Sequence, residues 1–118
     1  MSAPQSGALE AIDRILNRGG DADDVLRAVV AALHERAGYA WAGIFFVEGE
    51  ELALGPQAGV PDEARRTQVP VEFQGDRVAE LAVDGAAESD RAFLDRVAVL
   101  ISVHCLVGWD TRGERWVP

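Results

Sequence analysis

Few side chains in this sequence could carry out chemistry, and their spacing fits neither a catalytic nor a metal site. Cys105 is the only cysteine, so the chain can form neither an internal disulfide nor a cysteine-based zinc site, and the thiol has no resolving partner. Its neighbours Val103 and Leu106 predict a small buried hydrophobe with a raised thiol pKa. His104 is adjacent to Cys105 but faces elsewhere on a helix. We therefore expect no metal, no cofactor and no catalytic residue.

Charged side chains near the middle of the chain are the remaining candidates. Asp84 ends an apolar stretch just before Gly85. Acid–base catalysis needs a second group with a tuned pKa, and none is suggested nearby, so a turn or capping role is favoured. Arg65 and Arg66 could bind an anion, although exposed solubilising charges are the commoner role of such a pair.

The charge balance excludes two classes of partner. The chain has 20 acidic and 11 basic residues, giving a formal charge of −9. Such a surface repels nucleic acid phosphates and anionic lipid heads. No apolar run approaches the ~20 residues that cross a membrane, and the N-terminus lacks the basic-then-apolar pattern of a secretory signal. We therefore expect a cytoplasmic protein that binds neither nucleic acid nor membrane.

The elements that would position these residues follow from apolar periodicity and turn signals. They are predicted in the order helix (8–17), helix (22–37), strand (39–47), short strand (52–54), loop (56–66), strand (68–73), strand (78–83) and helix (90–109). Short links imply antiparallel pairing within each hairpin, and the helices must cover one face of the sheet. The sequence thus predicts an α/β (α+β) domain over 7–110, with four to five antiparallel strands and three helices mainly on one face. Residues 1–6 are expected to form a flexible tail and residues 111–118 a polar one.

The last predicted helix is apolar over most of its circumference, a pattern typical of a helix buried on more than one side. A domain of this size with three helices has little material to bury it twice. We therefore expect a homodimer, for which a twofold contact is the commonest arrangement. The alternative is that the first helix alone covers the second side. The expected interface comprises Leu9, Ile12, Ile15, Leu16, Val99, Val103 and Leu106.

Several segments resemble a known family. Residues 41–46 (WAGIFF) followed by 52–59 (LALGPQAG) are similar to the first hairpin of GAF domains, most closely of the branch that reduces free methionine-R-sulfoxide. Residues 69–71 (VPV) and 80–84 (ELAVD) are similar to two later strands of that branch. The resemblance extends from about residue 8 to residue 107 and implies a GAF-like fold. GAF domains commonly act as sensory or scaffold units, so it also implies that class of function.

The sequence departs from the reductase pattern where that chemistry lies. In the reductases a long insertion carries the catalytic cysteines and the pocket lid, whereas only Val60 to Gln68 fill this gap here, without a cysteine. Arg66 and Ala82 stand where the branch has carboxylates, and Phe45 stands in place of a tyrosine. Because the reaction requires a thiolate at the site, a diverged reductase is the least favoured function.

The favoured interpretation is a non-catalytic, minimal GAF-like module that acts through dimerisation and protein contacts, with an unidentified protein partner as a further option. Its alternative is a small-molecule sensor that keeps a reduced pocket on the sheet face. The residues expected to line that pocket are Trp41, Phe45, Val69, Val71 and Asp84.

Overall fold

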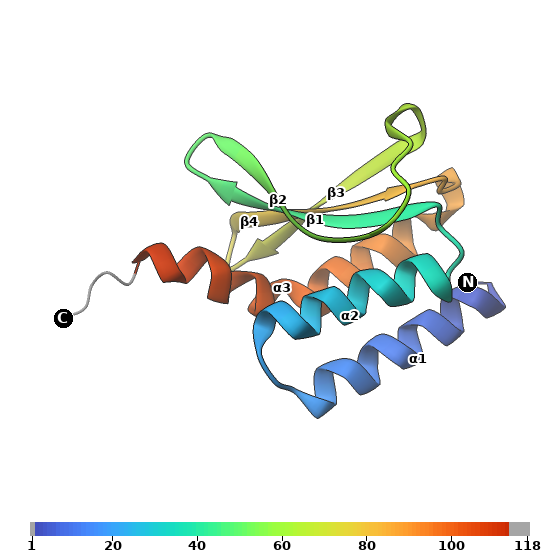
Figure 1. Cartoon of the computed structure of the whole chain (residues 1–118), viewed down its shortest axis with the longest axis horizontal. Coiled ribbons are helices and arrows are strands. Elements are labelled where there is room, and N and C mark those ends of the chain that lie inside the picture. Colours follow the sequence, from blue (N-terminus) through green and yellow to red (C-terminus); the bar gives the residue numbers. More distant parts are fainter. Residues whose placement is uncertain (1, 114–118) are drawn as a thin grey trace.

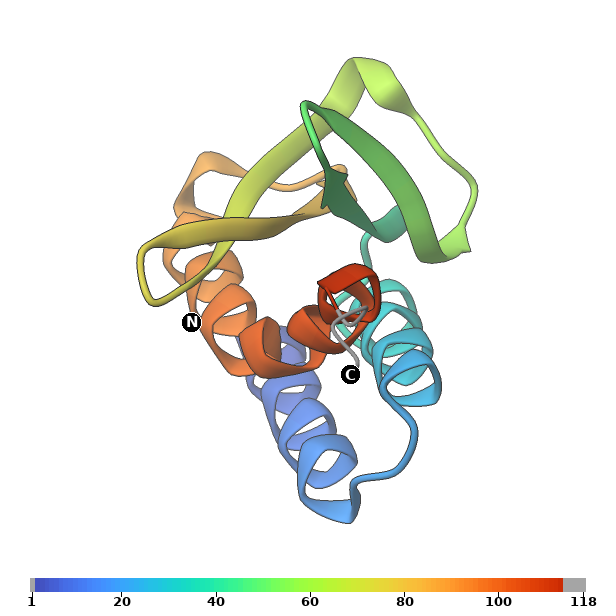
Figure 2. The same ribbon diagram turned by 90° about the vertical axis from the view of Figure 1, so that its left-hand side faces the viewer.

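Three helices lie against one face of a four-stranded antiparallel sheet (Figures 1 and 2). The computed structural model describes residues 2–113, and side chains over residues 2–106. The elements are α1 (Ala3–Arg18), α2 (Ala22–Glu35), β1 (Trp41–Glu48), β2 (Glu51–Gly59), η1 (Glu63–Arg65), β3 (Arg66–Phe73), β4 (Asp76–Asp84), η2 (Glu88–Asp90) and α3 (Arg91–Gly113). This arrangement confirms the fold class that the sequence predicts.

The sheet consists of two hairpins that pair through β1 and β4, in the order β2-β1-β4-β3. All three pairings are antiparallel, and Trp41 lies opposite Asp84 where β1 meets β4. The strands β2 and β3 therefore form the two edges. Because β1 and β4 are central, residues on these two strands occupy the middle of both sheet faces.

Alternate residues of the strands point to opposite faces, as the pleat requires. One set is buried between sheet and helices: Ala42, Ile44, Val69, Val71, Ala79, Leu81 and Val83. The helices contribute Leu26, Val29, Val30, Leu33, Phe93, Leu94, Val97 and Ile101 to the same core. The other set, which includes Trp41 and Asp84, lies on the face away from the helices, here called the outer face.

The N-terminal segment is helical, so the prediction of a flexible tail over 1–6 is wrong for its described part. Ser2 caps α1, and a reciprocal pair of hydrogen bonds with Gln5 forms a capping box, which satisfies amide groups that a helix leaves free. The Gln5 side chain also donates to Asp90 Oδ1 at 2.7 Å, and the Tyr39 hydroxyl donates to Asp90 Oδ2 at 3.0 Å. These bonds tie the start of α1 to the start of α3.

Two further boundaries differ from the sequence prediction. Strand β2 continues through Gly55 and Pro56, which were expected to end it, because the ladder with β1 contains an irregularity between Gly43 and Phe45. Proline is tolerated on an edge strand and at a bulge, where its missing N–H costs no ladder bond. Helix α3 continues to Gly113, so residues 111–113 are helical rather than part of a tail, and 114–118 lie outside the described residues.

Residues 2–113 include no helix that is both long enough and apolar enough to span a bilayer.

Candidate functional site

A buried ion pair lies on the outer face, at the end of the β3–β4 hairpin. The register places Arg66 directly opposite Asp84. Arg66 donates from Nε to Asp84 Oδ1 at 2.8 Å and from Nη2 to Oδ2 at 3.0 Å, the two-pronged geometry that makes arginine–carboxylate pairs strong. The backbone N–H of Asp62 donates to Oδ2 as well. Asp84 is 0% exposed, so this carboxylate is neutralised entirely from within the chain.

The surroundings keep both partners charged. Burial on its own raises the pKa of the Asp84 carboxyl, but the hydrogen bonds from Arg66 and Asp62 and the nearby arginine charges outweigh it, and the pKa lies below its ordinary value of 3.8. The pKa of Arg66 is raised, chiefly by its hydrogen bond to Asp84. Neither group has a pKa near neutral pH, so the pair does not resemble an acid–base catalyst.

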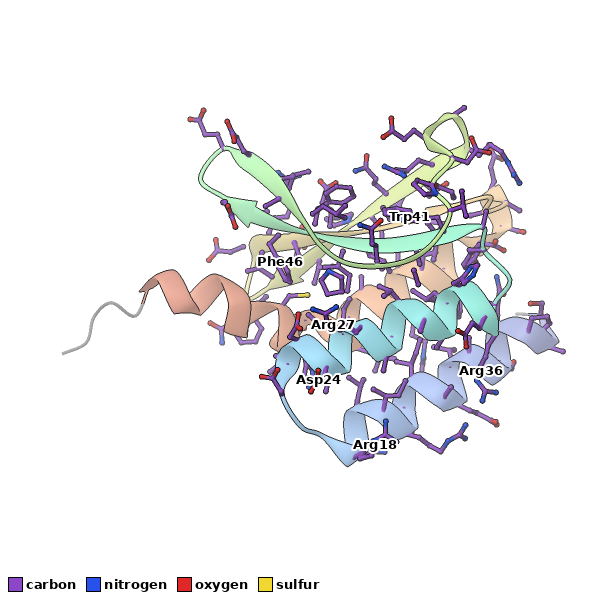
Figure 3. The ribbon with its side chains drawn as sticks, viewed as in Figure 1. Arg18, Asp24, Arg27, Arg36, Trp41 and Phe46 are labelled. Atoms are coloured by element: carbon purple, nitrogen blue, oxygen red, sulfur yellow. The ribbon has the colours of Figure 1, made fainter. Side chains whose placement is uncertain are left out.

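Trp41 covers the centre of the outer face beside this pair. Its ring centroid lies 4.1 Å from the guanidinium carbon of Arg66, within the range of a cation–π contact. Its indole Nε1 donates to Gln57 Oε1 at 2.9 Å, and Phe45 packs against it with ring centroids 6.3 Å apart. Trp41 is only 1% exposed, and Figure 3 shows it above β1, with Phe46 below, toward the helices.

The absence of a side chain at residue 43 allows the indole to lie flat on the sheet. A Cβ at Gly43 would come within 2.4 Å of Trp41 Cη2 and 2.5 Å of Cζ2. The connection from β2 to β3 is short, with η1 (Glu63–Arg65) as its one helical turn. It leads directly into Arg66, whose side chain folds over Trp41. The centre of the outer face is thus filled by the chain's own side chains.

The described residues bring together only part of the pocket predicted from sequence. Trp41, Phe45 and Asp84 share the outer face, as expected. Val69 and Val71 do not, because alternation along β3 turns both toward the helices, where they are fully buried. Their assignment to a ligand pocket is therefore corrected. Surface hollows formed by the described residues include grooves between β3 and α3, between α1 and α3 and between α1 and α2, all away from Trp41.

The sequence does not identify two residues that contact Trp41 and Asp84, namely Gln57 and Arg66. Gln57 carried no signal, because its role depends on the register of β2 against β1. The sequence predicts Arg66 only as a candidate anion-binding residue, whereas the structure makes it the partner of Asp84. The signal was present, since a hairpin turn at residues 74–75 brings the two ends of β3 and β4 together.

The residues expected at a dimer interface also divide into two groups. Ile12 is 0% exposed and belongs to the core, so it cannot reach a second copy, and its assignment is corrected. Leu9, Ile15, Leu16 and Leu106 are partly exposed. Val99 and Val103 are 72% and 56% exposed. Helix α3 therefore presents uncovered apolar side chains on the side away from its own core.

Three exposed carboxylates at the start of α2, those of Asp21, Asp23 and Asp24, lie within 4.8 Å of one another. Asp23 already accepts a hydrogen bond from Arg27 at 2.8 Å. Acidic residues in a first helical turn complement the helix dipole. We therefore treat this trio as a solvated helix start and assign no metal to it.

Cys105 lies in the core between sheet and helices and is fully buried. Burial raises the pKa of its thiol to about 12, as the sequence predicts. Its side chain is on the opposite side of the sheet from Trp41 and Asp84. Because only the thiolate is a strong nucleophile, the geometry gives Cys105 a packing role.

Alkylation measures this burial directly. We expect iodoacetamide at pH 8 to modify Cys105 in the folded chain at least ~100-fold more slowly than in the unfolded chain, because the thiol is both inaccessible and protonated. Mass spectrometry of timed samples with and without guanidinium gives the two rates. A folded-state rate close to the unfolded one would show that the thiol is accessible after all.

The architecture is that of the GAF-like fold, and comparison with solved structures bears this out. The GAF domain of a phosphoenolpyruvate-protein phosphotransferase from Coxiella burnetii superposes with a TM-score of 0.77 at 14% identity, covering 95% of this chain and 99% of that one. The corresponding domain from Acinetobacter gives 0.74 at 14% identity, covering 96% and 99%. Free methionine-R-sulfoxide reductase from Neisseria meningitidis, in complex with its substrate, gives 0.72 at 16% identity, covering 94% and 95%.

Neither the models of known protein families nor the curated protein sequences give a match to this chain. At identities of 14–16%, the structural matches establish a shared fold. A fold of this kind hosts both regulatory domains and enzymes, so the function must be argued from the side chains.

Proposed function

We propose that this chain is a non-catalytic, cytoplasmic regulatory module with a GAF-like fold, which works as a homodimer and through protein contacts. The observation that carries the proposal is the uncovered apolar side of α3. The row along this side contains the exposed large apolar side chains of Val99 and Val103, one helical turn apart, and exposed apolar surface of this kind marks an interaction site. The occupant that we assign to this row is a second copy of the chain.

The spacing of the row is that of a helix–helix seam. The positions are Ala92, Arg96, Val99, Val103 and Leu106, all exposed or partly exposed, at intervals of four, three, four and three residues. Such intervals are those of the a and d positions through which two helices pack knobs into holes. The seam lies opposite the core residues of the same helix, so α3 has one face for its own domain and one for a partner.

The charge of Arg96 in the seam and the acidic charges beside it support a copy of the same chain as the partner. A hollow between α1 and α3 is lined by Leu9 and Leu100 together with Glu10, Asp13 and Arg96. The acidic side chains are on α1 and the basic one is on α3. In a twofold contact each surface meets itself, so the Arg96 of one copy can approach the acids of the other. A surface that carries both signs is suited to such pairing.

The outer face supports the non-catalytic part of the proposal. Arg66, Asp84 and Trp41 satisfy one another or are satisfied by Gln57 and Asp62. A small molecule would first have to displace the indole and break the ion pair, at the cost of leaving a buried charge unpaired. This self-filled surface favours the dimeric module over a sensor with a reduced pocket. The buried thiol of Cys105 likewise favours it over a thiol-dependent reductase.

A charged side chain in the seam tests the proposal. We expect Val103→Glu to raise the dimer dissociation constant by ~10–100-fold, because a twofold interface buries the unpaired carboxylate twice. Val60→Glu is the matched control, since Val60 is 78% exposed and lies outside the helices. Analytical ultracentrifugation gives the dissociation constants, and circular dichroism confirms that both variants fold. Equal constants for Val103→Glu and the unmodified chain would reject this seam as the interface.

A further inference from the structure

The free edge of β3 is the second unpartnered feature of the molecule. Strand β3 ends the sheet, and no strand pairs with its other side in the described part of the chain. The Gly85 amide donates to the Arg65 carbonyl at 3.0 Å. This bond shows which residues of β3 direct their backbone groups toward β4. Since backbone groups alternate in direction along a strand, those of Arg66 and Gln68 point away from β4, together with the carbonyl of Pro70.

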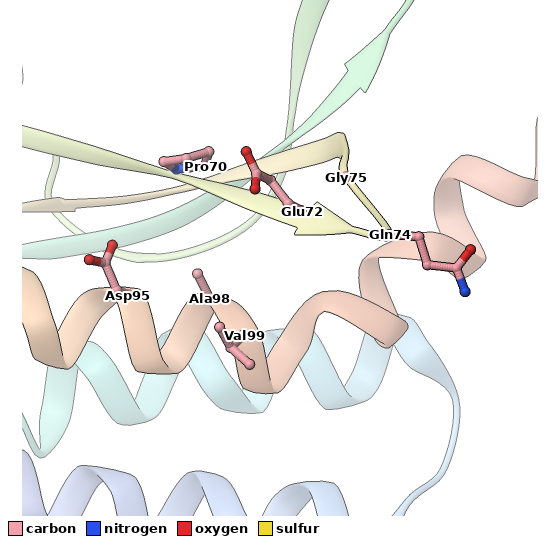
Figure 4. A pocket seen from close by; sticks show the side chains of 7 residues that line it. All are labelled: Pro70, Glu72, Gln74, Gly75, Asp95, Ala98 and Val99. Carbon is pink, nitrogen blue, oxygen red and sulfur yellow. The ribbon is translucent and has the colours of Figure 1, made fainter.

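A groove follows this edge between β3 and α3. It has a volume of about 390 Å³ and is lined by Pro70, Glu72, Gln74, Gly75, Asp95, Ala98 and Val99. Figure 4 shows Asp95 and Ala98 on the side of α3 that faces the strand. A strand added to β3 would lie 4.7–4.9 Å beyond it. Alternate side chains of that strand would then enter the groove above α3.

The charges at the groove are acidic. Glu72 lies on the strand side, is exposed, and has no ion-pair partner among the side chains of residues 2–106. Asp95 lies on the helix side and, among the side chains of residues 2–106, pairs only with exposed Arg91, at 3.0 Å. An exposed pair of this kind contributes little, so a ligand cation can replace it. The groove thus has Ala98 and Val99 on its helix side beside the Asp95 carboxylate, and the Glu72 carboxylate lies on the outer side of β3 at its rim (Figure 4).

We propose that this groove binds an extended, basic segment of another protein, which adds to the sheet as a fifth strand along β3. Backbone hydrogen bonds to Arg66, Gln68 and Pro70 would supply affinity, as in other cases of strand addition. Because alternate residues of a strand point to opposite faces, the small apolar side chains of the segment that face the helices contact Ala98 and pass Asp95, and its outward-facing lysine or arginine side chains lie beside Pro70 and reach Glu72 (Figure 4). The proposed site shares Val99 with the seam, but its β3 edge, Glu72 and Ala98 lie outside the seam, and binding there does not require the chain to dimerise.

Pro70 favours a segment of another protein over a second copy of this chain as the strand that pairs with β3. If two β3 strands paired with each other, each would place its own Pro70 in the new ladder, and two donors would be lost. Proline on an edge is one of the devices that prevent such self-pairing. A foreign segment pairs with the single Pro70 of one chain. Since Pro70 has no N–H to donate, only one backbone hydrogen bond of the new ladder is lost.

The test uses the full chain labelled with nitrogen-15 and the capped peptide acetyl-Lys-Val-Lys-Val-Lys-Val-Lys-amide. We expect amide chemical shifts to move at Gln68, Glu72 and Ala98, and Glu72→Lys to weaken binding by ~10-fold or more, because a like charge replaces the attracting one. Glu51→Lys is the matched control. It makes the same change of charge at an exposed position of the opposite edge strand and should alter the affinity less than ~2-fold.

A second peptide separates strand addition from simple charge attraction. It carries N-methyl groups on alternate residues, which remove the backbone donors along one edge, and it should bind at least ~10-fold more weakly. Equal affinity for both peptides, or equal losses in the Glu72 and Glu51 variants, would overturn the proposal. So would intermolecular contacts between the β3 strands of two copies, which would identify the second copy as the occupant. Circular dichroism confirms folding of each variant.

Discussion

Replacing Asp84 by alanine is expected to lower the free energy of unfolding by about 3 kcal/mol or more. The carboxylate is fully buried and accepts two hydrogen bonds from Arg66. Removal of one partner from a buried ion pair typically costs ~3–5 kcal/mol, since the other charge stays behind without compensation. The Arg66 side chain keeps 15% exposure, which places the expected loss toward the lower end. Urea unfolding followed by circular dichroism measures it.

Two comparisons identify the source of this loss. Asp76→Ala removes an exposed carboxylate from the start of the same strand and should change the stability by less than ~0.5 kcal/mol. Asp84→Ala combined with Arg66→Leu removes both charges and should cost less than the two single changes added together. A loss below ~1 kcal/mol for Asp84→Ala would mean that the pair is solvated and does not hold the outer face together.

The same carboxylate gives the stability a defined dependence on pH. The pKa of Asp84 in the folded chain lies below its ordinary value of 3.8, so the unfolded state binds the proton more readily. The contribution of Asp84 is therefore complete above pH ~4 and is lost as the pH falls through the folded-state pKa. The difference in stability between the unmodified chain and Asp84→Ala should shrink over this acidic range.

Replacing Trp41 by alanine is expected to cost about 3–5 kcal/mol, the range found for large aromatic residues in well-packed sites. The indole is 1% exposed, stacks with Arg66 and donates to Gln57. Leu54→Ala on the same sheet face is the control, because Leu54 is exposed and should cost less than ~1 kcal/mol. Similar losses for both variants would contradict the account of Trp41 as the residue that fills the outer face.

The sequence predicts those parts of the fold that depend on local patterns. Apolar periodicity placed α2 and α3, and glycine-containing turns placed both hairpins. The start of α1 differs from the prediction because its capping box, formed by Ser2 and Gln5, lies in a polar segment that has no apolar periodicity. The length of β2 was missed because Gly55 and Pro56 usually end a strand, whereas an irregular edge ladder accommodates them.

The candidate site was less predictable because it depends on register and on what covers each face. A strand pattern shows that Val69 and Val71 share a face, but not that helices rather than a ligand cover it. The pairing of Arg66 with Asp84 follows from the register of one hairpin. The resemblance to GAF domains directed attention to Trp41 and Asp84, yet it did not reveal that they are satisfied by side chains of the same chain.

Sedimentation equilibrium of the unmodified full chain is the most direct test of the central claim, that α3 has a second face for another copy. The account predicts twice the monomer mass at micromolar concentration, with dissociation only on further dilution. A monomer mass at every concentration up to ~1 mM would leave the seam without a partner of its own kind, because a dimer weaker than that has less than ~4 kcal/mol of binding free energy. The homodimer proposal would then be wrong.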